Sequence, residues 1–193
     1  TFSYQWQYNN GGTWGNVSNG TPTGFTYTGG TAATFSVAGI SAAGSYQYRC
    51  IISQTGAGCG QLTTSTATVT VVADPTVGTQ PSSPATICVG GTTANMTVAG
   101  SGGTGTFSYQ WQYNNGGTWG NVSNGTPAGS AYTGGTAATF SVAGISGAGT
   151  YQYRCMISQS GSGCGTLTSN TVNVVVVADP SLSAATQTNS VIC

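Results

Sequence analysis

The feature that most constrains this chain is an internal repeat with a period of 105 residues. The sequence TFSYQWQYNNGGTWGNVSNGTP stands at residues 1–22 and again, letter for letter, at residues 106–127. The same offset relates Cys50 to Cys155, with no insertion or deletion in either copy. A period near 100 residues matches a complete β-sandwich domain and is too long for a solenoid repeat or a propeller blade. We therefore expect each repeat to be a domain.

The duplicated segment has the pattern of a β-hairpin with one buried face. Aromatic residues alternate with Ser and Gln over residues 107–113, which is the period of a half-buried strand. The dipeptide Asn115-Gly116 tolerates the positive φ angles of a two-residue type I′ turn, so a second strand is expected over residues 118–123. Trp6 and Trp111 are expected at the centres of their domains.

The tryptophan of the second hairpin strand is expected on the outer face of the sheet. If residues 115–116 form the turn, antiparallel pairing sets Trp119 beside Gln110 and Gln112 and away from Trp111. An exposed Trp beside Gln suits a sugar-binding platform, and it equally suits packing against a neighbouring domain or chain. The possible contact surface consists of Trp14, Trp119, Gln110 and Gln112.

Five further segments carry strand patterns, and no segment has a helical period. Strands are expected over residues 85–88, 92–99, 136–145, 150–158 and 167–177. Alternation places Met96, Val98, Phe140, Val142, Tyr153, Cys155, Ile157, Val172, Val174 and Val176 on inward faces. With seven or eight short strands per period, the sequence predicts an all-β fold of tandem immunoglobulin-like antiparallel β-sandwich domains.

The repeat divides the chain into three parts. Residues 1–73 are expected to be an Ig-like repeat lacking its first strands, 74–178 a complete repeat, and 179–193 a linker with the first strand of a further repeat. In the first part, core residues such as Phe35 and Val37 would be uncovered unless a neighbouring segment packs on them. We therefore expect a filament of domains in line, formed by one very long chain or by many chains joined end to end.

Formal charge is almost absent, which excludes several classes of function. Arg49, Arg154, Asp74 and Asp179 are the only charged side chains, and there is no Lys, Glu or His. Acid–base catalysis and metal binding need such groups, so no enzyme, no metal and no cofactor are expected. One Arg per repeat cannot neutralise nucleic acid, and the longest apolar run is too short to insert in a membrane. A neutral Thr, Ser, Gly and Asn surface favours self-association instead.

Each period carries three cysteines, which suggests an oxidising location, either secreted or at the cell surface. Because the number is odd, one cysteine is left over in each domain. Cys155 is interpreted either as a small buried apolar residue or as the partner of Cys88 or Cys164, and a bond of the Cys88 to Cys164 type could instead join two domains. The disulfide candidates are Cys50, Cys59, Cys88, Cys155, Cys164 and Cys193.

Three motifs resemble the Ig-like repeats of very large surface adhesins and gliding-associated proteins of Bacteroidota. They are YQWQ at residues 109–112, GGTW at 116–119 and YRC at 153–155. The resemblance implies a structural repeat of an extracellular bacterial stalk or fibre, with a glycan-binding adhesin as the alternative. The general Ig pattern has a Tyr two residues before the second Cys, as at Tyr153, but Met96 stands where the first Cys is expected.

Overall fold

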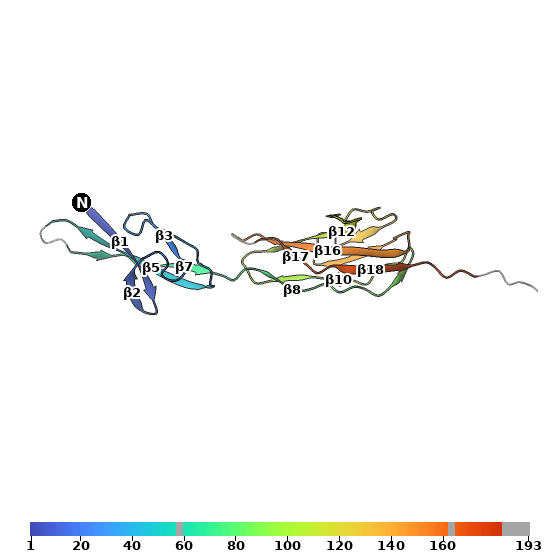
Figure 1. Ribbon diagram of the computed structural model, residues 1–193, viewed down its shortest axis with the longest axis horizontal. Coiled ribbons are helices and arrows are strands. Elements are labelled where there is room, and N and C mark those ends of the chain that lie inside the picture. The colour runs from blue at the N-terminus through green and yellow to red at the C-terminus, as the bar shows by residue number, and fades with distance from the viewer. Residues whose placement is uncertain (57–59, 162–164, 183–193) are drawn as a thin grey trace, which may run out of the picture. The chain divides into compact units, whose positions relative to one another are not determined.

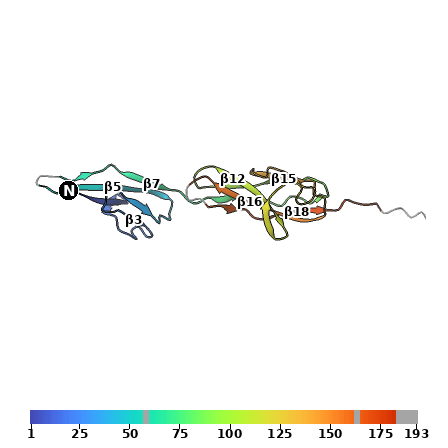
Figure 2. The same cartoon turned by 90° about the horizontal axis from the view of Figure 1, so that it is seen from above.

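The computed structural model describes residues 1–56, 60–161 and 165–182 and divides the chain into two compact units, Thr1–Asp74 (unit 1) and Pro75–Cys193 (unit 2). Both units are built from strands, and no helix occurs among the described residues (Figures 1 and 2). The predicted all-β, immunoglobulin-like sandwich class is confirmed.

Unit 2 contains the larger of the two sets of strands. They are β8 (Thr76–Thr79), β9 (Ile87–Cys88), β10 (Met96–Thr97), β11 (Ala99–Ser101), β12 (Phe107–Asn115), β13 (Thr118–Asn121), β14 (Ala131–Thr133), β15 (Thr139–Ala143), β16 (Gly149–Gln159), β17 (Leu167–Thr168) and β18 (Val172–Val177). One sheet has the order β13-β12-β16-β18-β9, with β17 also paired to β16, and the other has the order β10-β15-β14. The strands pair antiparallel except β9, which runs parallel to β18.

The core of unit 2 lies between these two sheets. Trp111 is fully buried and stacks on Phe140 with 4.5 Å between ring centroids, while its indole Nε1 donates to the Ala137 carbonyl at 3.0 Å. The alternation of each strand therefore delivers the inward residues that the sequence predicts. Buried around Trp111 are Met96, Val98, Phe140, Val142, Ile145, Tyr153, Cys155, Ile157, Val172, Val174 and Val176.

Unit 1 repeats part of this arrangement. Its strands are β1 (Phe2–Asn10), β2 (Thr13–Asn16), β3 (Thr26–Thr28), β4 (Ser36–Ala38), β5 (Gly44–Gln54), β6 (Leu62–Thr63) and β7 (Ala67–Val71). The larger sheet has the order β2-β1-β5-β6 with β7 also on β5, and β3 pairs with β4 alone. Its buried core is reduced to Phe25, Tyr27 and Tyr48, with Trp6 and Phe35 only partly buried.

The hairpin turn differs from the prediction by one residue. Asn115 pairs with Thr118, so the two-residue loop is Gly116-Gly117, with φ angles of 62° and 95°. Two consecutive glycines adopt positive φ without the cost of a Cβ, which leaves Asn115 free to stay in the strand. The pairing shifts by two residues as a result, and every side chain keeps its predicted face.

Other strand boundaries are also shorter than the alternation suggests. The segment expected as one strand over residues 167–177 is split into β17 and β18. At the break the Cys155 N–H donates to the Ser169 hydroxyl at 2.9 Å, and the Ser169 N–H donates to the Cys155 carbonyl at 2.9 Å. The Ser169 side chain thus replaces a ladder bond, and such local hydrogen bonds interrupt regular pairing.

Candidate functional site

The candidate site is the outer face of the sheet formed by β13, β12, β16 and β18, which we call the polar face. These strands present polar side chains outward because their alternate residues fill the core. The polar face consists of Gln110, Gln112, Asn114, Trp119, Asn121, Gln152, Arg154 and Asn173.

The centre of the polar face is a pair formed by Arg154 and Trp119. The Arg154 guanidinium lies 4.2 Å from the centroid of the half-buried Trp119 ring. The Arg154 Nε donates to the Gln112 Oε1 at 3.0 Å, because Gln112 lies directly opposite on β12. Neither contact is anionic, so Arg154 is fixed by stacking and by a neutral acceptor while keeping its charge uncompensated.

Amide side chains extend this pair into cross-strand ladders. The Gln112 Nε2 donates to the Asn121 Oδ1 at 3.3 Å across the hairpin. The Asn114 Nδ2 donates to the Gln152 Oε1 at 2.9 Å, and the Gln152 Nε2 reaches the Asn173 Oδ1 at 3.5 Å. The ladders hold uncharged donors and acceptors in fixed positions, which lowers the entropy that a ligand must remove on binding.

The structure places the four predicted contact residues in two groups. Trp119 lies opposite Asn114, and Arg154 links it to Gln112. Gln110 is instead used internally, since its Nε2 donates to the backbone carbonyls of Trp111 at 3.0 Å and Gly135 at 3.4 Å. Sequence reasoning missed the role of Arg154, although it is one of only two cations in the chain.

Unit 1 carries the same central contacts. The Arg49 guanidinium lies 4.3 Å from the centroid of the Trp14 ring, and its Nε donates to the Gln7 Oε1 at 2.9 Å. The Gln7 Nε2 then donates to the Asn16 Oδ1 at 3.1 Å. The polar face is therefore a recurring feature of the repeat, presented once per domain.

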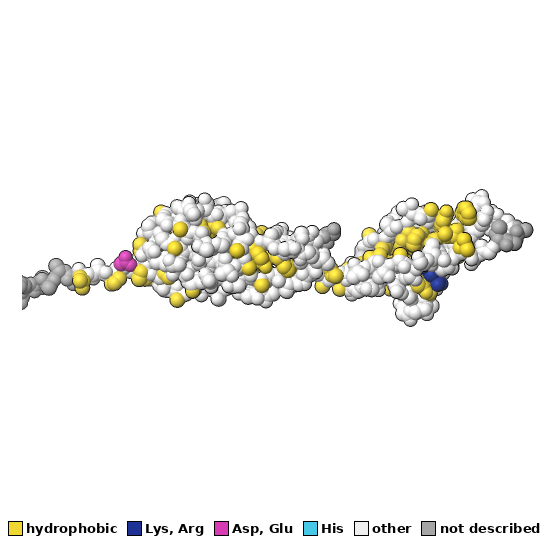
Figure 3. Space-filling view, turned by 180° about the vertical axis from the view of Figure 1, so that it is seen from behind, with side chains coloured by type: hydrophobic (Ala, Val, Ile, Leu, Met, Phe, Trp, Pro, Cys, Tyr) yellow, Lys and Arg dark blue, Asp and Glu magenta, His cyan; other side chains and the backbone are white. Residues whose placement is uncertain are grey.

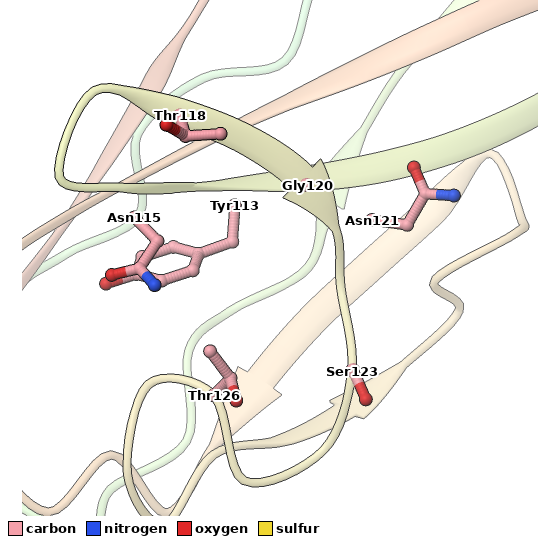
Figure 4. A pocket seen from close by; sticks show the side chains of 7 residues that line it. All are labelled: Tyr113, Asn115, Thr118, Gly120, Asn121, Ser123 and Thr126. Carbon is pink, nitrogen blue, oxygen red and sulfur yellow. The ribbon is translucent and has the colours of Figure 1, made fainter.

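A pocket of about 380 Å³ opens beneath the hairpin of unit 2. Figure 4 shows Tyr113 and Asn115 projecting from the hairpin toward Thr126 on the following loop. The lining is uncharged, and burial raises the pKa of the Tyr113 phenol, which keeps it neutral. The volume lies at the lower end of the range of about 300–1,000 Å³ for small-molecule sites. The complete lining is Tyr113, Asn115, Thr118, Gly120, Asn121, Ser123 and Thr126.

The described cysteines carry free thiols. Cys50 and Cys155 are buried and Cys88 is exposed. Burial raises the pKa of the Cys155 thiol to about 11, against the smaller opposing effect of a backbone hydrogen bond from Gln110. The remaining disulfide candidates, Cys59, Cys164 and Cys193, lie outside the described residues, so the predicted pairing stays a prediction.

A second hollow, of about 360 Å³, lies on unit 1 and differs from the first in being apolar. Figure 3 shows hydrophobic side chains, drawn in yellow, gathered in a band across this unit. The hollow lies against the side of β4 opposite its only partner, β3. We call it the open face of unit 1, and it is lined by Trp6, Phe35, Ser36, Val37, Tyr48, Ala67 and Val69.

No family model matches the sequence, and no curated protein matches it. Among solved structures, a marsupial T cell receptor is 13% identical over 94% of this chain and 66% of its own, with a TM-score of 0.51. An amphioxus IgVJ-C2 molecule is 14% identical over 90% of this chain and 88% of its own, with a TM-score of 0.40. Domains 3–5 of Drosophila OTK are 19% identical over 92% of this chain, with a TM-score of 0.39.

These likenesses bear on the fold. The T cell receptor structure supports the immunoglobulin-like sandwich. The chain spans about half of the OTK domains, 54% of their length. In the part of the chain that the structure describes, no helix is long and apolar enough to span a bilayer, and no group of three or more His, Cys, Asp or Glu residues could hold a metal ion.

Proposed function

We propose that this chain is a structural repeat of an extracellular bacterial surface fibre or stalk, secreted or held at the cell surface, which self-assembles in line as a filament. The observation that carries the proposal is the open face of unit 1. Phe35 and Val37 are partly exposed there, next to Trp6, whereas their counterparts in unit 2 are buried. A contiguous apolar patch of this kind marks an interaction surface.

The nearly neutral surface supports the same proposal. Two Arg and two Asp in 193 residues give a net charge of zero, so long-range repulsion between copies is absent. Most of the exposed side chains that remain are short hydroxyls and amides, which associate without the desolvation cost of ions. The resemblance of the YQWQ, GGTW and YRC motifs to repeats of Bacteroidota surface proteins supports a bacterial surface location.

The test combines denaturing gels with electron microscopy of the purified chain. We expect filaments, and with reductant omitted a ladder of bands spaced by about one chain mass, 19.1 kDa, if disulfides join the chains. Filaments with a monomer band in both lanes would indicate non-covalent assembly. A monomer band in both lanes from particles that form no filaments would refute the assembly.

A glycan-binding adhesin module is the second candidate, and the polar face favours it. The Trp119 ring, the amide ladders and the uncharged pocket beneath the hairpin provide an aromatic surface with fixed hydrogen-bonding groups. Because Arg154 covers part of the ring, stacking of a sugar on Trp119 requires the guanidinium to share or leave that place. Binding by the pocket avoids this competition.

Paired substitutions separate the two candidates, because Trp14 and Trp119 are equivalent. Glycan-array binding that is lost in the double Trp→Ala variant, retained in the double Trp→Phe variant and accompanied by intact filaments would favour adhesion. Loss of filaments in the Ala variant, with no glycan bound by any form, would favour assembly and rule out the adhesin.

A further inference from the structure

The two repeats form a matched comparison, because residues 31–40 of unit 1 have the same sequence, TAATFSVAGI, as residues 136–145 of unit 2. In unit 2 this stretch is sealed: Phe140 is 0% exposed and Val142 1% exposed. In unit 1 the counterparts Phe35 and Val37 are partly exposed. Identical residues with different burial show that the difference comes from what covers them.

In unit 2 the cover is the segment that contains β10. Met96 and Val98 point into the core and are 1% and 0% exposed. Met96 pairs with Phe140 on β15, and the Val98 N–H donates to the Ala138 carbonyl at 2.9 Å. The segment therefore supplies both apolar side chains and backbone hydrogen bonds.

Thr93 completes the seal at the other end of the same strand pair. Its N–H donates to the Val142 carbonyl at 3.0 Å, and its hydroxyl accepts from the Val142 N–H at 3.1 Å. The Thr93 side chain is itself buried. Residues 1–74 contain no counterpart of this segment, so the corresponding groups of Val37 lack these partners.

The missing partner also affects the secondary structure of unit 1. β15 runs over Thr139–Ala143 between two neighbouring strands, whereas β4 extends only over Ser36–Ala38 and pairs with β3 alone. The hollow of about 360 Å³ lies where β10 lies in unit 2. Its lining combines an apolar floor with an unpaired strand edge, which are the two requirements for strand addition.

We propose that the open face of unit 1 is an acceptor for one β-strand with the alternating pattern Ala-x-Met-x-Val, as in residues 94–98, supplied by a further repeat of the same kind. The inference rests on the proposed structural role and names the partner by which repeats join. Main-chain bonds to β4 give affinity, and the alternate Ala, Met and Val side chains give specificity.

The occupant must be an additional strand rather than residues 92–99 of a second copy. In each copy that segment already seals unit 2, where Met96 and Val98 are buried. Donating it to unit 1 of a neighbour uncovers the same residues in the donor, so the exchange exposes as much apolar surface as it buries. An extra strand buries the open face with no such loss.

The test titrates a synthetic peptide of residues 89–101 into the full chain. We expect one peptide per chain in calorimetry, with slower hydrogen exchange of the backbone amides of residues 35–38. A peptide carrying Met96→Asp and Val98→Asp should bind at least about tenfold more weakly, since burying two unpaired carboxylates is costly. The protein is unchanged in that comparison, so its result does not depend on a variant that folds.

Variants of the acceptor provide the reciprocal measurement. Val37→Asp should weaken binding of the wild-type peptide by at least about tenfold, while Val72→Asp, at an exposed position outside the hollow, should leave it unchanged. Absence of peptide binding to the folded wild-type chain, or binding that the two peptide substitutions do not weaken, would overturn the proposal. Dimers that excess peptide cannot dissociate would overturn it in favour of a second copy.

The acceptor and the filament fail in different ways. Filaments from a chain that binds no peptide would leave the structural role standing and remove the acceptor. One-to-one peptide binding by a chain that forms no filaments would keep the acceptor and remove self-assembly.

Discussion

Replacing Trp111 with Ala should destabilise unit 2 far more than replacing Trp6 with Ala destabilises unit 1. Both indoles stack on a phenylalanine, at 4.5 Å and 4.6 Å between ring centroids, and both donate to a carbonyl at 3.0 Å. They differ in burial, since Trp111 is fully buried and Trp6 is partly exposed. The pair therefore isolates the contribution of the cover over the core.

The expected magnitude for Trp111→Ala is about 3–5 kcal/mol, the usual range for removing a buried Trp. Stacking and the indole hydrogen bond contribute about 1 kcal/mol each and are common to both sites. The hydrophobic part scales with buried area, so we expect Trp6→Ala to cost roughly half as much. The larger value is a big share of the free energy of unfolding of a domain of this size.

Urea unfolding of the full chain, followed by hydrogen exchange at amides of each unit, measures the two losses separately. A similar loss of unfolding free energy in the two units would refute the reasoning, because it would mean that unit 1 is sealed in solution. A Trp111→Ala variant with almost unchanged stability would refute the assignment of Trp111 to the core.

Three further predictions concern unit 2. Cys88 should react rapidly with thiol reagents at pH 8 and Cys155 only on unfolding; because burial raises the Cys155 pKa to about 11, the free energy of unfolding should fall as pH rises from about 9 toward 11, measurable by urea titration. Ser169→Ala should cost about 1–3 kcal/mol by leaving the buried Cys155 N–H without its acceptor, whereas Ser169→Thr should be nearly neutral in the same assay. Arg154→Ala should cost about 1 kcal/mol through its contact with Trp119, seen as a lower urea midpoint.

The choice of Thr as the control at Ser169 comes from the repeat itself. In unit 1 the equivalent acceptor is the Thr64 hydroxyl, which receives the Cys50 N–H at 3.0 Å. The equivalent pair in unit 2 is Ser169 and Cys155, at 2.9 Å. A large loss in the Thr variant would show that side-chain size, rather than the hydroxyl, decides stability at this position.

Much of the fold follows from local patterns that the sequence displays directly. Alternation over residues 107–113 places Trp111 inward, and this holds even though the turn is Gly116-Gly117 rather than Asn115-Gly116. A shift by two residues preserves the face because the side-chain period is two. A shift by one would have moved Trp119 into the core side.

Features that depend on distant pairing were not predictable. The parallel pairing of β9 with β18 joins Ile87 to Val176, and nothing local to either segment indicates it. The Arg154 contact with Trp119 requires the register of three neighbouring strands, which alternation alone does not fix. The sequence also could not show that Gln110 is used for backbone bonds, because either amide of the YQWQ motif could face outward.

Sedimentation velocity of the purified chain over a range of concentrations tests self-assembly most directly. The proposed structural role predicts a weight-average mass that rises with concentration well above 19.1 kDa, in the presence and absence of reductant. An excess of the 89–101 peptide should lower that mass if the open face of unit 1 mediates the association. A single 19.1 kDa species at every concentration, with unit 1 folded by hydrogen exchange, would contradict the account.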